Sequence, residues 1–233
     1  MKIDFVVIAS DNNPLYYDFY PVVSRQWNCL GYKVFFINIS DEDSCIEETD
    51  YGLIKKVKSI AGIPTGFQAQ VVRFYAPTLL KENNFLLSDI DMLPLNGTYY
   101  FNEAEKIPND QILIYSGQPY TTTPFYPVCY ILGNGAILKN IMQIDGSYEN
   151  FISKMAVYSN LDWNTDEKYF YNAICKNPDK ATILKDRDFK RRIDRGNWTY
   201  SIEKLNSGYY IDSHLLRPYI QYKNDIDRLR ISL

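Results

Sequence analysis

Short apolar runs alternate with amphipathic segments along the first forty residues. Residues 2–10 (KIDFVVIAS) and residues 33–39 (KVFFINI) are each almost continuously apolar, which is typical of strands buried on both faces of a mainly parallel sheet. Between them, residues 15–32 carry apolar side chains at helical spacing and reach Gly31, a residue type that commonly ends helices. The pattern therefore predicts a β-α-β unit, whose two strands lie parallel.

The next sixty residues predict another helix and another strand. The helix is expected to begin at Thr65, which stands three residues before Gln68 as in a capping box, and to bend or end at Pro77. Residues 83–93 (NNFLLSDIDML) then read as a strand that carries two aspartates near its end. The apolar stripe of the helix is formed by Phe67, Val71, Phe74 and Tyr75.

The rest of the chain continues the alternation of strands and helices. Strands are predicted within residues 111–117 and 128–138, the second with a tight turn or a close backbone approach at its glycines, and helices within residues 147–159 and 165–177. Such alternation indicates an α/β fold, in which helices flank a mainly parallel central sheet. A length of 233 residues with 46% hydrophobic residues fits one domain, residues 1–233.

Charge is distributed unevenly along the chain. The formal net charge is −3, but residues 181–233 contain 11 Lys and Arg against 7 Asp and Glu, a surplus of +4 that leaves −7 for the remainder. The basic residues are too few and too interleaved with acids to form a nucleic-acid-binding stripe. They suffice to neutralise a small anionic ligand such as a diphosphate.

The sequence also carries signals of cellular location. The N-terminal apolar run FVVIA is too short for a signal peptide or a transmembrane helix. Cys29, Cys45, Cys129 and Cys175 form no CxxC pair and no regular framework, which favours buried thiols in a reducing compartment. We therefore expect a cytoplasmic protein without a transmembrane segment.

Asp89 and Asp91 stand one residue apart where a strand is predicted to leave the sheet. In open α/β sheets, ligands bind at the carboxyl ends of strands, and side chains two residues apart on a strand point to the same side. Two carboxylates this close repel each other unless a cation lies between them. The pair is therefore a candidate divalent-cation site; the alternative is a turn in which the aspartates bond their own backbone.

His214 is the only histidine of the chain, and Arg217 follows three residues later. Manganese accepts an imidazole beside carboxylates, and a guanidinium is a planar donor for phosphate oxygens. The two residues are therefore candidates for a combined metal and diphosphate site. The alternative for a lone histidine is an ordinary core or surface position.

Two further charged positions are candidates for a sugar pocket. Asp166 and Glu167 begin a predicted helix, where acidic side chains also stabilise the helix dipole, and Trp163 beside them offers an apolar stacking surface. Arg73 lies off the apolar stripe of its helix, so it must find an anion or reach water. A substrate phosphate or sugar and the Asp89 carboxylate are its two candidate partners.

Four stretches carry a family resemblance: IDFVVIASDNN, QAQVVRFYAPTLLKENNFLLSDIDMLPL, WNTDEKYF and HLLRP. Their order resembles nucleotide-sugar-dependent glycosyltransferases of the GT-A fold, in particular small single-domain ones encoded by large algal (chlorella) viruses. The resemblance implies a Rossmann-like GT-A domain with a nucleotide-binding half, about residues 1–95, and an acceptor-binding half, about residues 96–233. If the protein is viral, it would act in the host cytoplasm.

The resemblance also implies a metal and diphosphate site. Asp91 would bind Mn²⁺ (or Mg²⁺) directly, and Asp89 would join the metal site nearer the ribose and sugar. His214 would complete the metal shell. Arg217 would contact the diphosphate.

Donor-binding and catalytic roles follow from the same resemblance. Arg73 is similar to a helix arginine near the donor sugar, and Asp166 to a carboxylate facing the reacting carbon, so both are catalytic candidates. The end of the first strand would contact the nucleoside. The implied donor-binding residues are Ala9, Ser10, Asp11, Arg73, Asp89, Ile90, Asp91 and Arg217.

Together these features predict a metal-dependent glycosyltransferase. It would move a hexosyl or deoxyhexosyl group from a UDP-sugar to a glycan hydroxyl, with retention at the sugar carbon, while the metal and basic residues stabilise the leaving diphosphate. A phosphatase of the haloacid-dehalogenase type is one alternative, but its DxDxT pattern would require Thr where Leu93 stands. A non-catalytic nucleotide- or glycan-binding module, with the same ligand-binding residues, is the other.

Overall fold

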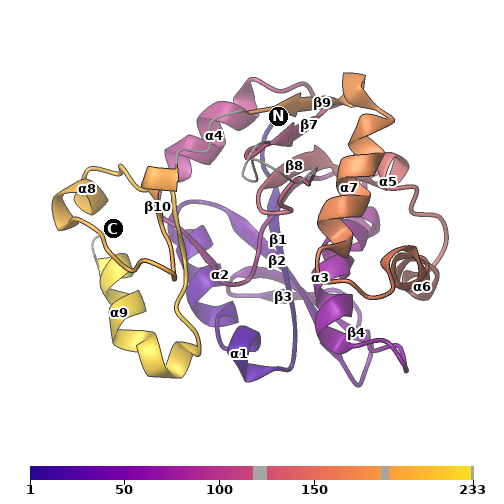
Figure 1. Ribbon diagram of the computed structural model, residues 1–233, viewed down its shortest axis with the longest axis horizontal. Helices are drawn as coiled ribbons and strands as arrows, with labels where there is room; N and C mark the ends of the chain where they lie inside the picture. Colours follow the sequence, from indigo (N-terminus) through magenta and orange to yellow (C-terminus); the bar gives the residue numbers. More distant parts are fainter. Residues whose placement is uncertain (118–124, 185–188, 232–233) are drawn as a thin grey trace.

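In the computed structural model, which describes residues 1–117, 125–184 and 189–231, the apolar runs form an eight-stranded central sheet (Figure 1). Its strands are β1 (Phe5–Asp11), β2 (Lys33–Ser40), β3 (Glu47–Thr49), β4 (Gly52–Lys58), β5 (Asn84–Leu87), β7 (Ile112–Ile114), β8 (Ile131–Asn134) and β9 (Ala181–Ile183). They lie in the order β3-β4-β2-β1-β5-β8-β7-β9. The middle strands β4, β2, β1 and β5 all run parallel, as the sequence predicts.

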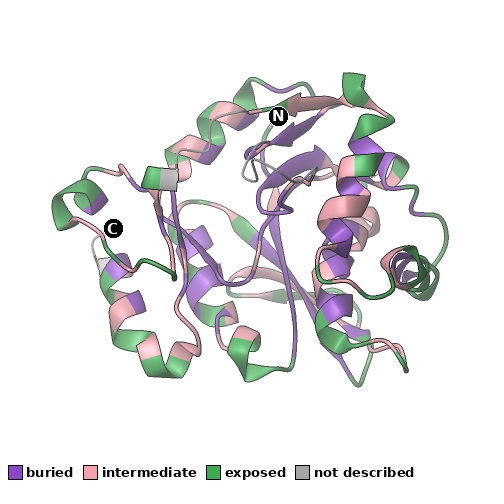
Figure 2. Cartoon of the chain, in the orientation of Figure 1, coloured by how far each residue is buried: buried purple, intermediate pink, exposed green. Residues whose placement is uncertain are grey.

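The helices cover both faces of this sheet because successive side chains of its strands point to opposite sides. Val6 of β1 packs into one core and Val7 into the other. Helices α2 (Tyr20–Cys29), α4 (Gly97–Glu105), α8 (Ile202–Asn206) and α9 (Tyr219–Ile231) contribute to the first core. Helices α3 (Thr65–Tyr75), α5 (Gly135–Ile141), α6 (Tyr148–Ser159) and α7 (Thr165–Cys175) contribute to the second. Figure 2 shows the buried residues on the strands and on the helix sides that face them.

A second, three-stranded sheet brings the C-terminal part of the chain to the end of β5. It consists of β6 (Met92–Pro94), β10 (Arg192–Ile193) and β11 (Asp212–His214), with β11 antiparallel to β6. His214 pairs with Met92, and the Leu215 amide donates to the Asp91 carbonyl at 2.9 Å. This sheet thereby places the histidine beside the aspartates.

The single helix expected over residues 15–32 is wrong, because the segment forms two helices. Helix α1 (Pro14–Tyr17) ends before α2 begins at Tyr20. Pro21 has no amide hydrogen to donate to the Tyr17 carbonyl, so one helix cannot run through it. Proline is accepted within the first turn of a new helix, where Pro21 lies. The predicted stop at Gly31 is confirmed by its positive φ of 88°.

The capping box predicted at Thr65 and Gln68 is also wrong. Neither side chain caps α3, whose N-cap residue is Pro64. The Thr65 hydroxyl donates to Asp11 Oδ2 at 2.7 Å, and the buried Gln68 amide donates to the carbonyl oxygens of Ile60 and Ile63. The two residues therefore fix the start of the helix to β1 and to the preceding loop. Beyond Tyr75 the chain continues as a 3₁₀ helix, η1 (Ala76–Leu80), that contains the expected break at Pro77.

Residues 128–138 contain a strand-to-helix junction where a continued strand or a tight turn was expected. The Asn134 side chain caps α5 by accepting the Ala136 amide at 3.0 Å, which is the role that asparagine favours. The close approach predicted at the glycines is found at Gly135, where an added Cβ would lie 2.4 Å from the Pro77 carbonyl oxygen. Two further 3₁₀ helices are η2 (Pro178–Lys180) and η3 (Phe189–Arg191).

The cysteines differ from expectation in their exposure. Only Cys129 is buried, whereas Cys29, Cys45 and Cys175 are exposed. All four lie within the described residues, and none of them forms a disulfide bond. Within the described residues, no helix is both long and apolar enough to span a bilayer.

Candidate active site

A cleft of about 460 Å³ opens at the carboxyl ends of β1 and β5. This is the position where open α/β sheets bind ligands, and the volume lies in the range of small-molecule sites. Every site residue predicted from the sequence lines it: Ala9, Ser10, Asp11, Arg73, Asp89, Ile90, Asp91, Asp166, His214 and Arg217.

The end of β1 forms one wall of the cleft. Ala9 and Ser10 are buried, and the Ser10 hydroxyl donates to the Asp11 carbonyl at 2.8 Å. Asp11 accepts the Thr65 hydroxyl on Oδ2 and the Asn13 amide, at 3.1 Å, on Oδ1. These contacts fix the Asp11 side chain at the cleft wall. The predicted nucleoside contact of these residues stays a prediction.

Arg73 of α3 connects two of the candidate acidic residues. It is only 6% exposed, and its guanidinium contacts the Asp89 carboxylate and donates to Asp166 Oδ2 at 2.9 Å. It also donates to the carbonyl oxygens of Gln70 and Ser88. A buried arginine needs such partners, and of the two candidate partners stated for Arg73, the structure supports Asp89.

The two carboxylates that flank Arg73 differ in their electrostatics. Asp166 is 1% exposed, and burial raises its pKa to about 6, although Arg73 acts in the opposite direction. Burial would also raise the pKa of Asp89, but Arg73 outweighs it and the pKa lies below its ordinary value. Asp166 is therefore the carboxyl group here that changes protonation near neutral pH.

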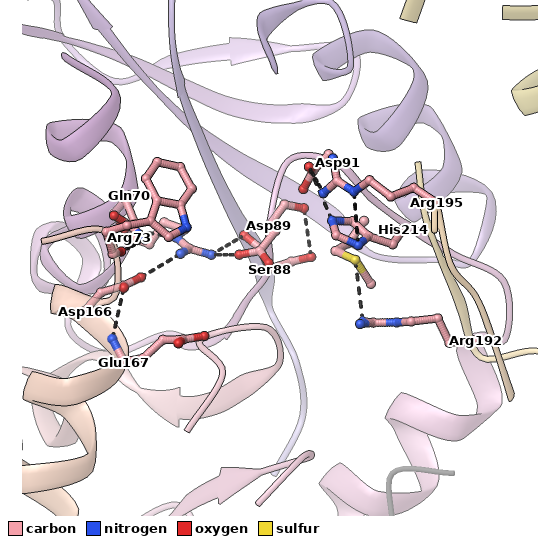
Figure 3. A network of polar contacts seen from close by, with 12 residues as sticks. Gln70, Arg73, Ser88, Asp89, Asp91, Asp166, Glu167, Arg192, Arg195 and His214 are labelled. Atoms are coloured by element: carbon pink, nitrogen blue, oxygen red, sulfur yellow. Dashed lines mark hydrogen bonds and ion pairs between the residues drawn. The ribbon is translucent and has the colours of Figure 1, made fainter. Parts of the chain in front are cut away.

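Asp89 and Asp91 follow β5 where it leaves the sheet, as predicted, but the strand expected over residues 83–93 ends at Leu87 and both aspartates lie in the turn before β6. The Met92 amide closes this turn by donating to the Asp89 carbonyl at 3.2 Å. Figure 3 shows that the two carboxylates bind different groups: Asp89 contacts Arg73, and Asp91 contacts Arg195 and His214. Both side chains line the same cleft.

His214 lies between two carboxylates. Its Nε2 is 3.6 Å from Asp91 Oδ2, and its Nδ1 is 3.5 Å from Asp194 Oδ2. Arg195 Nε donates to Nδ1 at 3.2 Å, which assigns the imidazole hydrogen to Nε2. Burial lowers the pKa of His214, and the nearby Asp91 opposes this shift. The imidazole is therefore held neutral, the form that binds metals.

The donor chemistry around Asp91 fits a divalent cation. A carboxylate oxygen and an imidazole nitrogen 3.6 Å apart are within reach of one ion, because such ligand bonds are about 2.0–2.2 Å long. Asp194 can accept the Nδ1 hydrogen when Nε2 is the ligand, as carboxylates behind metal-bound histidines do. Within residues 1–117, 125–184 and 189–231, no cluster of three or more acidic, histidine or cysteine side chains forms a ready metal site.

Arg217 lines the same cleft as Arg195. Its Nη1 donates to the Tyr16 hydroxyl, and its guanidinium carbon is 4.8 Å from the centre of the Tyr16 ring. This stacking holds the guanidinium at the cleft wall. No carboxylate in the described part of the chain forms an ion pair with it.

Arg195 and Asp194 are the site residues that the sequence did not reveal. Arg195 donates to Asp91 Oδ2 at 2.7 Å across 104 residues of sequence, so no local pattern could predict the contact. The only signal was the basic surplus of residues 181–233. Trp163, by contrast, lies at the cleft as expected, with 62% of its surface exposed.

Comparison with solved structures identifies the fold. Galactosyltransferase LgtC, solved in complex with donor and acceptor sugar analogs, matches 98% of this chain over 94% of its own length, with 11% identity and a TM-score of 0.54. Glycosyltransferase GlyE from Streptococcus pneumoniae TIGR4 matches 84% of this chain, with 13% identity and a TM-score of 0.48, and the chain spans 47% of its length. A glycosyltransferase involved in glycosylation of the major capsid of PBCV-1 matches 99% of this chain over all of its own length, with 9% identity and a TM-score of 0.46.

At such identities the likeness establishes the fold alone. No family model and no curated protein sequence matches the chain. The match to LgtC over nearly the whole of both chains, with the mainly parallel central sheet, confirms the predicted GT-A (Rossmann-like) fold.

Proposed function

We propose that the chain transfers a sugar from a nucleoside-diphosphate sugar, in the first instance a UDP-sugar, to a hydroxyl group of a glycan acceptor. The observation that carries the proposal is a single cleft that gathers all the predicted residues at the carboxyl edge of a GT-A sheet. The transferred group would be a hexosyl or deoxyhexosyl residue. Cysteines that form no disulfide suit a reducing compartment, so we place the reaction in the cytoplasm.

Asp91 and His214 are the residues that would hold Mn²⁺ or Mg²⁺, with Asp89 nearer the sugar. When bound, the cation supplies charge neutralisation at the diphosphate. With Nε2 as the metal ligand, Nδ1 would carry the imidazole hydrogen, and Asp194, 3.5 Å from Nδ1, would accept it. Arg195 donates a hydrogen bond to Asp91 Oδ2 in this structure. A cation and the guanidinium would therefore compete for the same carboxylate.

The remaining residues bind and orient the donor. Ala9, Ser10 and Asp11 at the end of β1 line the cleft and would contact the nucleoside. Arg217 would contact the diphosphate, where a fixed positive charge would stabilise the departing group.

The sugar would lie between Arg73 and Asp166. We favour retention at the sugar carbon, with the departing phosphate oxygen accepting the proton of the acceptor hydroxyl. Asp166, held by Arg73 at 2.9 Å, would then support the positive charge that develops on the sugar. In an inverting reaction Asp166 would instead be the base. The exposed Trp163 ring offers the acceptor a stacking surface.

A single assay separates this proposal from its alternatives. UDP release from UDP-glucose and other donors is measured with and without Mn²⁺, for the wild type and Asp91→Asn. Metal-dependent release that falls by at least about 100-fold in the variant supports a transferase. Phosphate release from simple monoesters would indicate a phosphatase, and binding without turnover would indicate a non-catalytic module.

A further inference from the structure

Arg195 follows β10 and lies across the cleft from Arg73, in contact with Asp91 and His214 (Figure 3). These contacts use two of its nitrogen atoms: Nη2 donates to Asp91, and Nε donates to His214. Its third nitrogen, Nη1, is buried and has no hydrogen-bond partner among the described residues. A buried N–H group without an acceptor is costly, so this nitrogen indicates a missing partner.

A second guanidinium lines the same cleft. Arg217 and Arg195 are both among its lining residues, together with Tyr16 and Asp91. Tyr16 accepts a hydrogen bond from Arg217 and thereby holds this guanidinium at the cleft. Two like charges that face one cleft repel each other, and an anion bound between them would relieve the repulsion.

The acidic residues nearby do not fill this role. Asp91 already accepts Arg195 Nη2, and Asp194 accepts the Gly196 amide while facing His214. Among residues 1–117, 125–184 and 189–231, Arg217 has no ion-pair partner. An anion that enters the cleft would meet the edge of each guanidinium, and phosphate oxygens match such edges well.

We propose that Arg195 is a second diphosphate-binding residue, which clamps the donor diphosphate together with Arg217. The inference rests on the proposed function for the identity of the anion. It also assigns Arg195 two competing partners, because the guanidinium that binds phosphate also covers the Asp91 oxygen that a divalent cation would use. Removal of its charge should therefore weaken anion binding and strengthen cation binding, a pair of opposite effects that a purely structural arginine would not produce.

The test uses inorganic pyrophosphate and Mn²⁺ as separate probes, measured by calorimetry on the whole chain. In Arg195→Gln, pyrophosphate binding without metal is expected to weaken about tenfold or more, because a charge-assisted hydrogen bond is lost. Mn²⁺ binding without pyrophosphate is expected to tighten. Arg25→Gln, an exposed arginine of α2, is the matched control and should change neither.

Arg217→Gln is the second variant. It breaks no ion pair, so folding is expected to persist, and it should weaken pyrophosphate binding while leaving Mn²⁺ binding unchanged. The inference is overturned if the wild type binds no pyrophosphate, or if either cleft variant binds it as the wild type does. Pyrophosphate binding does not require sugar transfer. Calorimetry therefore tests the arginine clamp, whereas the UDP-release assay tests the proposed transferase, and either can fail without the other.

Discussion

Arg73 controls the charge of two carboxylates on one side of the cleft. Because it is nearly fully buried, it remains cationic and lowers the pKa of Asp89, while Asp166, more deeply enclosed, keeps a pKa raised to about 6. Arg73 thus holds Asp89 ionised, whereas burial brings the midpoint of Asp166 to about one pH unit below neutral. This asymmetry suits a site that needs one permanent anion and one group able to exchange a proton.

Asp166→Asn should change how stability depends on pH. A carboxyl group whose pKa is raised in the folded state binds more protons when folded, so its contribution to the free energy of unfolding falls as pH rises. The pKa of Asp166 is near 3.9 in the unfolded chain and about 6 in the folded one. This difference corresponds to a loss of about 3 kcal/mol in the free energy of unfolding as the pH rises through both values. Urea unfolding between pH 4 and 7 should therefore show the variant gaining stability relative to the wild type. A difference in stability between variant and wild type that does not change with pH would contradict the account. Asp145→Asn, at an exposed position, is the control.

Arg73→Met should leave the Asp89 and Asp166 carboxylates without their cation. The expected loss in the free energy of unfolding at pH 7 is about 3 kcal/mol, because a broken buried ion pair leaves an uncompensated charge. The loss should shrink below pH 5, because in the variant burial raises the pKa of both carboxyl groups with no arginine to oppose it, so both take up protons there. Chemical denaturation at the two pH values measures this, with Arg25→Met as the control. An equal loss of stability at both pH values would mean that Arg73 acts by packing alone.

At the scale of single residues, the sequence predicted the charged groups better than their contacts. Asp89, Asp91, Asp166 and Arg73 could be chosen because their types and strand or helix positions carry local signals. The partner Arg195 could not, because its contact with Asp91 depends on a pairing across 104 residues.

At the scale of elements, apolar runs predicted the parallel strands, whereas helix starts depended on contacts the pattern does not contain. The sequence at the start of helix α3 resembled a capping box, but the side chains of Thr65 and Gln68 form hydrogen bonds to β1 and to the preceding loop. The sheet of β6, β10 and β11 could not be predicted either, because its strands are only two or three residues long and show no periodic pattern of apolar residues. It is nevertheless the element that delivers His214 to Asp91.

Gln68→Leu tests the position of α3 through its loop. The Ile60 amide donates to Gln68 Oε1 at 3.0 Å, so the variant removes its acceptor. We expect hydrogen exchange at Ile60 to accelerate by at least about tenfold, since a hydrogen bond of about 1.5 kcal/mol is lost. Gln70→Leu, two residues later in α3, should leave this amide unchanged. Faster exchange confined to the first turn of α3 would instead favour the capping box.

At the scale of the whole molecule, the cleft has two chemically different ends. Arg73, Asp89 and Asp166 form one, beside α3 and α7, and Asp91, His214 and Arg195 form the other, beside the small sheet. The chain closes this arrangement by returning its C-terminal part to the end of β5. A ligand that fills the cleft would therefore contact segments from both halves of the sequence, which would couple its binding to the stability of the entire fold.

The central claim is that this cleft binds a nucleoside diphosphate with help from a cation at Asp91, and the melting temperature tests it most directly. With Mn²⁺ and UDP at about 100 times the dissociation constant, bound ligand contributes about 2.7 kcal/mol, which for a chain of this size is a rise of about 5–10 °C. We predict this rise for the wild type and a much smaller one for Asp91→Asn. The absence of any rise with UDP and a panel of nucleotide sugars, or an equal rise in the variant, would contradict the account.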